Sequence, residues 1–429
     1  MRVFLSAGEP SGDHHAAVLV RAIRDRRPDA VCVGLGGPHM AAEGCELVAD
    51  MTSLAVMWIV RVVLNIHHFV DLARRAERSF LDARPDVCVL VDFPGFHWWL
   101  AWRAKRHRIP VVFYCPPQIW AWASWRVAKM RRLVDHVLSP LPFEHDWFTA
   151  HGLPSTLVGH PFFDELATSD TTRDVARDGA EAAVSGTACC GPQPLVLLLP
   201  GSRWQEIEGN LDTLIRAAGL IRLQVPAARF AVGALHDRHA RRIREVIDGS
   251  PEARGLGIDV QSGRTRSLIS EARAAIACSG SVSLELLAAR VPTVIVYRIS
   301  SFAYVVQSWL RRARFITLVN LLASREPIGP VRREWRPPTA VAPADPEAIY
   351  PEYLAVQDPA DRVTEHVVDW LADPASRAGV VERLEMLAAA IARPGSADRA
   401  AEAVVAIAVS GAAVGRDAGR QPSAGRVAA

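Results

Sequence analysis

Residues 3–13 read VFLSAGEPSGD, an apolar run that ends in a turn of small residues. Apolar side chains then recur at helical spacing over residues 16–23. A strand that passes through a small-residue turn into a helix is typical of the first unit of a Rossmann-like domain, where the helix N-terminus favours an anion or a hydroxyl-rich ligand. The turn is not the G-x-G-x-x-G dinucleotide pattern. The alternative is that Ser11 or Asp13 serves only as a helix N-cap.

Short apolar runs alternate with segments of helical periodicity over residues 1–168. We expect helices near residues 13–27, 66–83 and 97–107. This alternation predicts a parallel sheet covered by helices, and hence an α/β fold. The expected strands are Val3–Ala7, Val31–Leu35, Val87–Asp92, Val111–Tyr114 and Val137–Ser139.

A second series of strands follows a polar, Gly/Ala/Ser-rich linker at residues 169–194. We therefore expect two Rossmann-like domains, an N-terminal one (1–168) and a C-terminal one (195–360). Helices over 361–409 come next, and packing against the N-terminal domain is one option for them. Residues 410–429 form a tail too poor in large apolar side chains to fold. The expected C-terminal strands are Leu195–Leu199, Arg229–Val232, Ile258–Gln261, Ala274–Cys278 and Thr293–Tyr297.

Charge and hydropathy exclude several classes of protein. The 49 basic and 46 acidic residues leave a net charge of +3, too balanced for a nucleic-acid binder. Mean hydropathy is high, at +0.11. The longest apolar stretch, residues 54–64, is nevertheless interrupted by Arg61, and a spanning helix needs about 20 apolar residues. The N-terminus does not have the pattern of a signal peptide, so we expect a cytosolic chain.

Cysteine and histidine spacing argues against a metal centre. The 14 histidines form no His-x-x-x-His motif, and the seven cysteines lack the paired spacing of a zinc site. We predict reduced core thiols, no catalytic metal and no cofactor. The cysteines are Cys32, Cys45, Cys88, Cys115, Cys189, Cys190 and Cys278.

Two residues of the first half are candidates for the chemistry. Asp92 stands at the carboxyl end of an expected strand, where ligands collect in open α/β sheets, and a carboxylate there can accept a proton from a substrate hydroxyl. The alternative is an Asp that caps the next helix. His160 faces the ligand cleft in one interpretation and is satisfied by the backbone in the other.

The second half offers groups that suit a nucleotide. Arg203 ends a Pro-Gly-Ser-Arg turn, and its guanidinium suits phosphate, with an ion pair to Glu206 as the alternative. Residues 279–281 begin a helix and supply N–H and hydroxyl donors for a diphosphate. Glu285 can accept from ribose hydroxyls or complete a capping box. Asn320 is an amide in an apolar run, where a buried amide needs a defined partner.

Taken in order, these motifs resemble the lipid-A-disaccharide synthases, glycosyltransferases of family 19 with two Rossmann-like domains. Each motif alone is weak evidence for this family, whereas the ordered set is specific to it. The matching segments are Ala7–Asp13, Gly36–Met40, Leu54–Met57, Trp120–Trp122, Pro142–Glu144, Gly159–Pro161, Pro200–Arg203, Ser279–Glu285 and Asn320–Leu322.

The resemblance implies a GT-B-type fold with two parallel sheets that face an interdomain cleft. The implied reaction moves 2,3-diacylglucosamine from its UDP carrier to 2,3-diacylglucosamine 1-phosphate, and forms a β-1,6-linked disaccharide 1-phosphate and UDP. Peripheral association with the inner face of the inner membrane is also implied, and a homodimer is left open. The implied site residues are Asp92 and Glu9 for catalysis, Ser11, Gly12, Met57, Trp122 and His160 for the substrate, and Arg203, Ser279, Gly280, Ser281, Glu285 and Asn320 for UDP.

Acceptor-side motifs depart from the family pattern more than donor-side motifs do. The identity of the acceptor is therefore less constrained than that of the nucleotide. One alternative is a related UDP-sugar glycosyltransferase with a different lipid or glycan acceptor, and another is a non-catalytic nucleotide-sugar or lipid-binding relative. The departures are Trp58 for Gly, Arg61 for Glu, Gly95 and His97 in place of Asp and Asn, and Pro116 and Gln118 in place of two serines.

Two segments are candidates for a surface that contacts lipid. Residues 54–70 suit insertion beneath lipid headgroups, and a buried helix packed on the sheet is the alternative. Between Trp98 and Trp147, seven tryptophans alternate with Arg and Lys. We expect these segments to visit the membrane that holds the acylated substrates.

Overall fold

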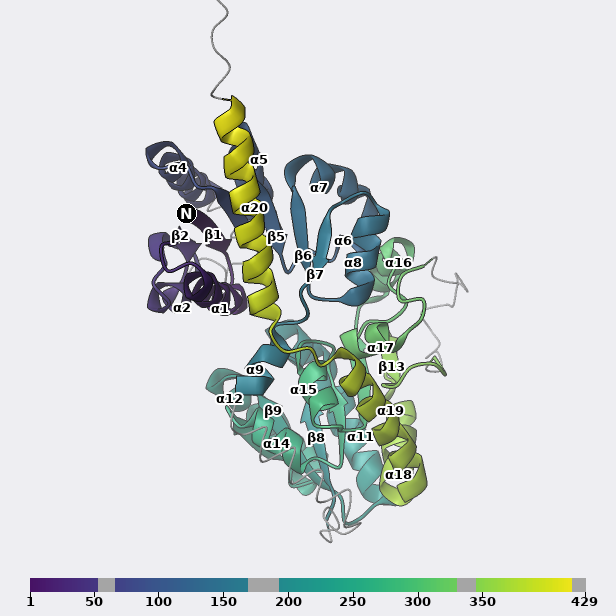
Figure 1. Cartoon of the computed structure of the whole chain (residues 1–429). Helices are drawn as coiled ribbons and strands as arrows, with labels where there is room; N and C mark the ends of the chain where they lie inside the picture. Colours follow the sequence, from purple (N-terminus) through teal and green to yellow (C-terminus); the bar gives the residue numbers. More distant parts are fainter. Residues whose placement is uncertain (53–65, 169–192, 330–344, 419–429) are drawn as a thin grey trace, which may run out of the picture. The chain divides into compact units, whose positions relative to one another are not determined.

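Parallel β-sheet forms the centre of two separate units in the computed structural model, which describes residues 1–52, 66–168, 193–329 and 345–418 (Figure 1). Unit 1 comprises Met1–Glu165 and Arg393–Ala429, and unit 2 comprises Leu166–Ala392. Both units are α/β, and every pair of neighbouring strands in the two sheets is parallel, which confirms the predicted fold class.

The sheet of unit 1 has the strand order β3-β2-β1-β4-β5-β6-β7. Its central strands are apolar on both faces because helices cover both sides. In β4, Cys88 and Leu90 join one buried cluster, and Val87, Val89 and Val91 join another. The strands are β1 (Arg2–Ala7), β2 (Val31–Gly36), β3 (Glu46–Asp50), β4 (Val87–Val91), β5 (Val111–Tyr114), β6 (His136–Ser139) and β7 (Ser155–Leu157).

The helices of unit 1 include one from the far end of the chain. Helix α20 packs along α1, and its inward face is made of small residues that allow close approach, such as Ala397, Ala400 and Ala401. The helices are α1 (Pro10–Arg26), α2 (Pro38–Ala42), α4 (Ile66–Asp82), α5 (Pro94–Arg106), α6 (Ile119–Trp122), the 3₁₀ turn η2 (Ser124–Arg126), α7 (Val127–Leu133), α8 (Pro142–Ala150), α9 (Phe162–Thr168) and α20 (Ser396–Ala418).

Unit 2 repeats this architecture with the strand order β10-β9-β8-β11-β12-β13. Its strands are β8 (Leu195–Leu199), β9 (Arg229–Ala234), β10 (Asp259–Ser262), β11 (Ala274–Ala277), β12 (Thr293–Arg298) and β13 (Glu352–Ala355). Its helices are α11 (Trp204–Gln224), α12 (Asp237–Gly249), α13 (Pro251–Gly255), α14 (Thr265–Glu271), α15 (Val282–Ala288), α16 (Ser301–Leu310), α17 (Leu318–Ala323), α18 (Ala360–Ala372) and α19 (Pro374–Ile391).

The C-terminal helices divide between the units. Helices α18 and α19 pack within unit 2, whereas α20 belongs to unit 1. The carboxylate of Asp164 accepts hydrogen bonds from the N–H groups of Gly395, Ser396 and Ala397, at 2.6, 3.0 and 2.9 Å, and so caps the start of α20. The helix runs to Ala418, into the segment that the sequence predicted as a tail.

Three edge strands, β3, β7 and β13, were absent from the strands predicted from the sequence. Each is short, and β7 reads Ser-Thr-Leu, without the apolar run that marks a buried strand. The switch in strand order lies between β1 and β4 in unit 1, and between β8 and β11 in unit 2. Ligands of open α/β sheets bind beyond the carboxyl ends of the strands at such a point.

The described helices include none that is long and apolar enough to span a membrane. Of the cysteines in the described ranges, Cys32, Cys45, Cys88 and Cys278 are buried and Cys115 is half-buried, all as free thiols. Residues 189 and 190, together with most of the proposed insertion segment at 54–70, lie outside the described residues.

Candidate functional site

The loops that follow β1 and β4 touch at the switch point of unit 1. A Cβ atom at Gly8 would lie 2.3 Å from Cγ of Phe93 and 2.8 Å from Cε of Met51, so a side chain at this position would clash. Gly12 lies beside Asp92, since a Cβ atom at Gly12 would be 3.9 Å from Cβ of Asp92. The structure therefore brings Gly12 and Asp92, two of the predicted site residues, together.

The backbone after β4 is held in a rare conformation. Asp92 has φ 53° and Phe93 has φ 46°, both in the left-handed region that residues with a side chain seldom adopt. The N–H of Asp92 still donates to the carbonyl of Tyr114, at 3.3 Å, so the residue continues the sheet pairing. Strain of this kind persists where surrounding contacts enforce it.

His97 supplies such a contact. Its ring is fully buried, with Nδ1 2.6 Å from the carbonyl oxygen of Asp92 and Nε2 2.9 Å from Oγ of Ser6 on β1. A carbonyl oxygen only accepts, so Nδ1 carries the hydrogen, and Nε2 accepts from the Ser6 hydroxyl. Burial lowers the pKa of His97 to about 4, which keeps the ring neutral. His97 therefore ties the main chain of Asp92 to β1.

The environment of Asp92 favours proton uptake by its carboxylate. Asp92 is half-buried, and burial raises the pKa of the carboxyl group, while the backbone N–H of Phe93 opposes that shift. A carboxylate whose charge is poorly solvated accepts a proton more readily than one in water. Asp92 therefore combines a backbone held in one conformation with a carboxylate of raised basicity.

Three polar residues in the segment after β1 lie in different surroundings. Glu9 occupies the N-cap position of α1, and Ser11 in the first turn is exposed. Asp13 is buried, and its carboxylate accepts from the N–H groups of Gly37 and Met40, at 2.7 and 3.2 Å. Asp13 therefore caps α2, and the alternative in which Ser11 or Asp13 caps α1 is wrong, since α1 has no side-chain cap.

The remaining predicted residues of unit 1 lie in other surroundings. Nδ1 of His160 accepts from the N–H of Phe162, at 3.2 Å, and burial lowers the pKa of His160 to about 4. Trp122 is exposed, with the guanidinium of Arg126 5.0 Å from its ring centre and the Trp125 ring at 6.2 Å. Met57 falls outside the described residues, as do Trp58 and Arg61.

Glu144 is a buried acid to which the sequence assigned no role. Its side chain is almost fully buried on α8, and Nε1 of Trp120 donates to one carboxyl oxygen, at 2.9 Å. Burial raises the pKa of Glu144 to about 8, so the group is largely protonated at neutral pH. The only signal in the sequence was its place in the Pro142–Glu144 motif.

In unit 2, the loop after β8 is organised around Glu206. The Glu206 carboxylate accepts from the N–H groups of Ser202 and Arg203, at 2.9 and 3.2 Å. The Arg203 guanidinium approaches the same carboxylate, at 3.4 Å, and is 79% exposed. An exposed pair of this kind contributes little to stability. The ion pair expected as the alternative role of Arg203 is therefore present, and its guanidinium also remains open to solvent.

The loop after β11 presents the start of α15. Gly280 and Ser281 are exposed at this helix N-terminus, while Oγ of Ser279 donates to the carbonyl of Ile316, at 2.9 Å. Glu285, one turn into the helix, lies 3.6 Å from the guanidinium of Arg266. A cavity of about 710 Å³ lies beyond the carboxyl ends of β9 and β10, the two strands that follow β8 on the side away from β11. It is lined by Leu235, His236, Asp237, Arg238, Ser262 and Gly263.

Asn320 has a structural role in this arrangement. Its Nδ2 donates to the carbonyl of Tyr350 and to the carboxylate of Glu352, both at 2.7 Å, and its Oδ1 accepts from the N–H groups of Ile349 and Tyr350, at 2.9 and 3.0 Å. All four hydrogen-bonding positions of the amide are thus occupied. A direct contact between Asn320 and UDP stays a prediction, and it would require one of these bonds to break.

Glu352 is the centre of the same network, and its only signal in the sequence was its place in a weak family match at residues 351–353. Its carboxylate accepts from the N–H groups of Ile316 and Thr317, at 2.7 and 2.8 Å, from the Thr317 hydroxyl and from Asn320. Burial raises the pKa of Glu352, and these hydrogen bonds oppose the shift. Because Ile316 also binds Ser279, the network positions the loop after β11.

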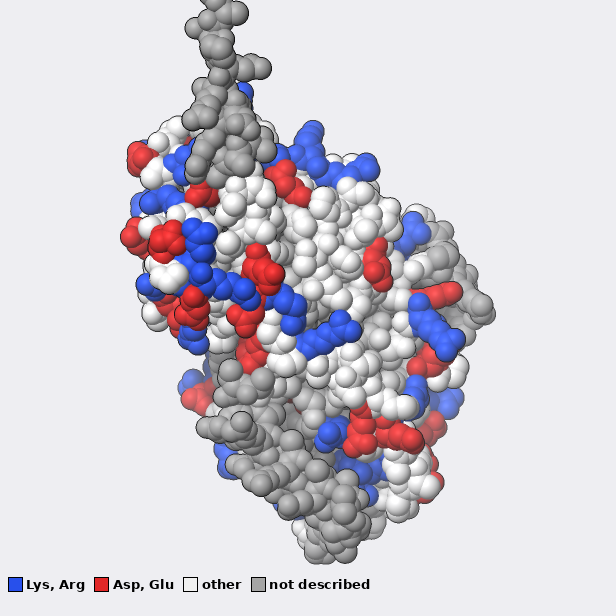
Figure 2. All heavy atoms as spheres, in the orientation of Figure 1, with Lys and Arg blue, Asp and Glu red and all other residues white. Residues whose placement is uncertain are grey.

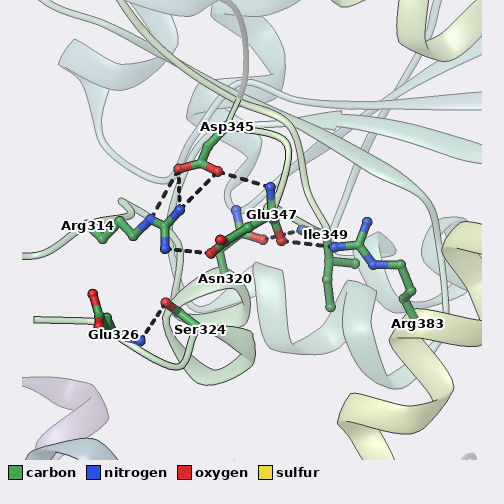
Figure 3. A network of polar contacts seen from close by, with 8 residues as sticks. All are labelled: Arg314, Asn320, Ser324, Glu326, Asp345, Glu347, Ile349 and Arg383. Atoms are coloured by element: carbon green, nitrogen blue, oxygen red, sulfur yellow. Dashed lines mark hydrogen bonds and ion pairs between the residues drawn. The ribbon is translucent and has the colours of Figure 1, made fainter. Parts of the chain in front are cut away.

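A second layer of ion pairs surrounds Asn320. Figure 3 shows Arg314 directed at Asp345 and Glu347, next to the hydrogen bond that the N–H of Ile349 donates to Asn320. The guanidinium of Arg314 meets the Asp345 carboxylate at 3.0 to 3.2 Å. Arg383 of α19 donates to the carbonyl of Glu347, at 2.9 Å. These contacts fix the chain that leads into β13.

Within the described ranges, no group of three or more His, Cys, Asp or Glu side chains is arranged to hold a metal ion.

Comparison with known proteins identifies the family of the chain. The family model described as lipid-A-disaccharide synthetase matches residues 3–333. The chain belongs to the lipid-A-disaccharide synthase family. It is 32% identical to the lipid-A-disaccharide synthase of Myxococcus xanthus over 94% of this chain and 97% of that one. It is 30% identical to the enzyme of Chromohalobacter salexigens over 96% and 98% of the two chains. The chain is therefore a glycosyltransferase of lipid A synthesis.

Solved structures support the GT-B fold at low sequence identity. The co-structure of S. aureus MnaA with UDP has a TM-score of 0.56 at 10% identity, and covers 93% of this chain and 94% of that one. MurG of Acinetobacter baumannii has a TM-score of 0.51 at 13% identity, over 94% and 99% of the two chains. These similarities show a shared fold.

Proposed function

We propose that this chain transfers 2,3-diacylglucosamine from its UDP carrier to 2,3-diacylglucosamine 1-phosphate, with Asp92 as the base. The observation that carries the assignment is the strained, half-buried Asp92 at the switch point of unit 1, in a chain of this family. The Asp92 carboxylate takes the proton of the acceptor 6-hydroxyl as that oxygen bonds to the anomeric carbon of the donor. The bond between this carbon and the diphosphate breaks, and UDP leaves.

The loop after β1 would bind the acceptor next to this base. Gly12 lies beside Asp92 and leaves room for a sugar to approach the backbone. Ser11 is exposed at the first turn of α1 and can donate to a sugar oxygen, while Glu9 at the N-cap is placed to orient a hydroxyl. Met57, Trp122 and His160 remain predicted contacts of the acylated substrate.

The donor would bind at the carboxyl edge of the sheet in unit 2. Helix α15 starts with exposed residues Gly280 and Ser281, whose N–H groups suit a diphosphate. Arg203 stays open to solvent and can exchange its exposed ion pair for a phosphate oxygen. These groups stabilise the charge that develops on the leaving diphosphate without a metal ion.

Ser279, Glu285 and Asn320 would support the donor in different ways. Glu285 at the first turn of α15 is placed to accept from ribose hydroxyls. Ser279 is anchored to Ile316, and Asn320 acts through Glu352 on the same segment. We therefore assign Asn320 a positioning role at the UDP site. The cavity beyond β9 and β10 is large enough for part of the nucleotide.

The exposed tryptophans of unit 1 would bring the enzyme to the inner membrane face. Trp99, Trp102, Trp122 and Trp125 are between 42 and 59% exposed on neighbouring segments around α5 and α7. The guanidinium of Arg106 lies 4.8 Å from the Trp102 ring. Figure 2 shows basic side chains gathered at the upper end of unit 1, around α7. Tryptophan with Arg and Lys suits the interfacial layer of an anionic bilayer.

The decisive experiment supplies both acylated substrates to the purified chain and measures UDP release. We expect turnover with the parent protein and a loss of at least a hundredfold with Asp92→Asn, because the amide cannot take up the proton. Folding of the variant is checked by its melting temperature. Tight UDP binding without UDP release by the parent would overturn the proposed reaction, and would favour another acceptor.

A further inference from the structure

Helix α16 of unit 2 presents an apolar face to solvent. None of its residues is buried, and Phe302 and Trp309 are 80% and 75% exposed. Val305 and Val306 are also exposed, at 44% and 38%. Spacings of three, four and seven residues place all four side chains on one face of the helix. Exposed aromatic side chains grouped in this way mark a binding surface.

The charged residues that directly follow this helix are all arginines. From Ile299 to Arg325 the sequence contains no Asp or Glu, while Arg311, Arg312 and Arg314 follow the helix directly. Arg314 is paired with Asp345 and Glu347. Arg312 and Arg325 are exposed, and neither makes an ion pair with any residue in the described ranges. Arg312, two residues after the helix, and Arg325, just before the 327–329 segment that pairs with residues 312–314, are therefore cations open to an anionic partner.

The helix is already formed without its partner. The Ser300 hydroxyl accepts from the N–H of Ala303, at 3.2 Å, and caps the N-terminus. The helix has 10 residues, about 15 Å of length. Its exposed apolar area is on the order of 500 Å², since an aromatic side chain buries about 150–250 Å². A stable protein interface needs about 800 Å² from each partner, so this face is small for a second chain.

We propose that α16 docks on an anionic lipid bilayer, with Phe302 and Trp309 among the upper acyl chains and Arg312 and Arg325 at lipid phosphates. Apolar side chains bordered by Arg are the combination that interfacial helices use. This inference extends the membrane association in the proposed function from unit 1 to the unit that would bind the donor. It does not depend on Asp92, because docking is measured without substrates.

The first test measures binding of the full-length chain to vesicles of phosphatidylethanolamine with 30% phosphatidylglycerol. We expect Phe302→Ser/Trp309→Ser to weaken co-sedimentation about tenfold, and Arg312→Gln/Arg325→Gln to weaken it severalfold and to reduce its salt dependence. The matched control is Leu223→Ser/Met386→Ser, which removes two exposed apolar side chains elsewhere in unit 2. Equal loss in both apolar variants would overturn the proposal.

The second test reports on α16 itself, so the tryptophans of unit 1 cannot mask the result. The chain is labelled with 5-fluorotryptophan, and the resonance missing in Trp309→Phe identifies Trp309. We expect vesicles that carry spin-labelled lipid to broaden this resonance, while buried Trp370 stays sharp. A vesicle-bound chain with a sharp Trp309 resonance would overturn the proposal, as would a dimer that dissociates in the Phe302→Ser/Trp309→Ser variant.

A third experiment, which measures turnover, distinguishes failure of the docking proposal from failure of the proposed reaction. With substrates dispersed in detergent micelles, the α16 variant keeps the turnover of the parent. With substrates embedded in vesicles, its turnover falls in parallel with binding. If the parent releases no UDP in either system, the proposed reaction fails, while the vesicle measurements still decide whether α16 docks.

Discussion

The loops that follow β4 and β11 lie at equivalent switch points of the two sheets, but their backbone conformations differ. After β4, Asp92 and Phe93 both adopt left-handed backbone, and buried His97 holds that conformation. After β11, Ser281 begins α15 with φ −58°, and the described residues 278–289 include no side-chain-bearing residue with positive φ. A single reacting side chain needs an imposed orientation, whereas a helix start presents its N–H donors through regular geometry.

The largest effect is expected at Asp92. Asp92→Asn keeps the size of the side chain and removes the proton acceptor, so kcat should fall between about 10² and 10⁴-fold. The free energy of unfolding should hold or rise, because the charge of the half-buried carboxylate is gone. UDP release and thermal melting measure the two effects. Turnover equal to that of the parent would assign Asp92 an orienting role and remove the main contrast between the two loops.

Acid should weaken unit 1 through three histidines that are neutral in the fold, the buried His97 and the half-buried His15 and His160. The pKa values of His15, His97 and His160 are lowered to about 4 by burial, from 6.5. The folded state therefore binds fewer protons, and the stability that these histidines contribute above pH 6.5 is lost as the pH falls towards 4. The fully buried ring of His97 should cost roughly 2 kcal/mol between pH 7 and 5.

Urea unfolding of the parent and of His97→Asn at both pH values measures this contribution. The variant should lose about 2 kcal/mol less than the parent over the same interval. Hydrogen exchange of the β1 and β4 amides would locate the effect in unit 1. An identical pH dependence in the two proteins would contradict the neutral, buried state of His97.

A matched pair of amides tests how His97 acts on Asp92. Asn places an N–H near the position of Nδ1 and keeps the bond to the Asp92 carbonyl, whereas Gln reaches towards Ser6 and gives up that bond. We expect His97→Gln to lower kcat about tenfold with little change in KM for the donor, the cost of losing about 1.4 kcal/mol of orientation. His97→Asn should retain most of the activity. Equal rates in the two variants would limit His97 to a packing role.

The smallest change in stability is expected at the exposed Arg203. Its ion pair with Glu206 is open to solvent, so Arg203→Ala should alter the free energy of unfolding by less than about 0.5 kcal/mol. Donor binding should suffer more, with KM for the UDP-sugar raised about tenfold by loss of a charge-assisted bond. Arg203→Lys, which keeps the charge and loses the planar fork, should fall in between. An unchanged KM in both variants would leave α15 as the main phosphate-binding element.

Much of the fold was predictable from local pattern. Apolar runs such as 87–91 and 195–199 proved to be central strands because both of their faces are buried, which makes every residue apolar. Three of the four edge strands, β3, β7 and β13, escaped prediction because solvent on one side relaxes that demand, as the polar β7 illustrates. Asp92, Arg203 and Ser279–Ser281 could be predicted as site residues because each follows an apolar run that the sequence predicts as a strand.

Partners distant in sequence were beyond prediction. Glu352 and Asn320 lie 32 positions apart and meet only when β13 joins the edge of its sheet. Ser6 and His97 are 91 positions apart, and His97 was visible in the sequence only as a departure from the family pattern. Nothing in a linear pattern assigns a hydrogen-bond partner across that separation, because closing the intervening chain depends on the whole core.

By itself, the sequence determined two parallel sheets, the strand ends that carry the chemistry and membership of one family, because strand burial and turn composition are local properties. Only the tertiary structure decided that α20 returns to unit 1, that His97 holds Asp92 in a left-handed conformation and that α16 keeps an apolar face in solvent. Whether an apolar residue is buried or exposed depends on what packs against it, and the packing partners come from distant parts of the chain.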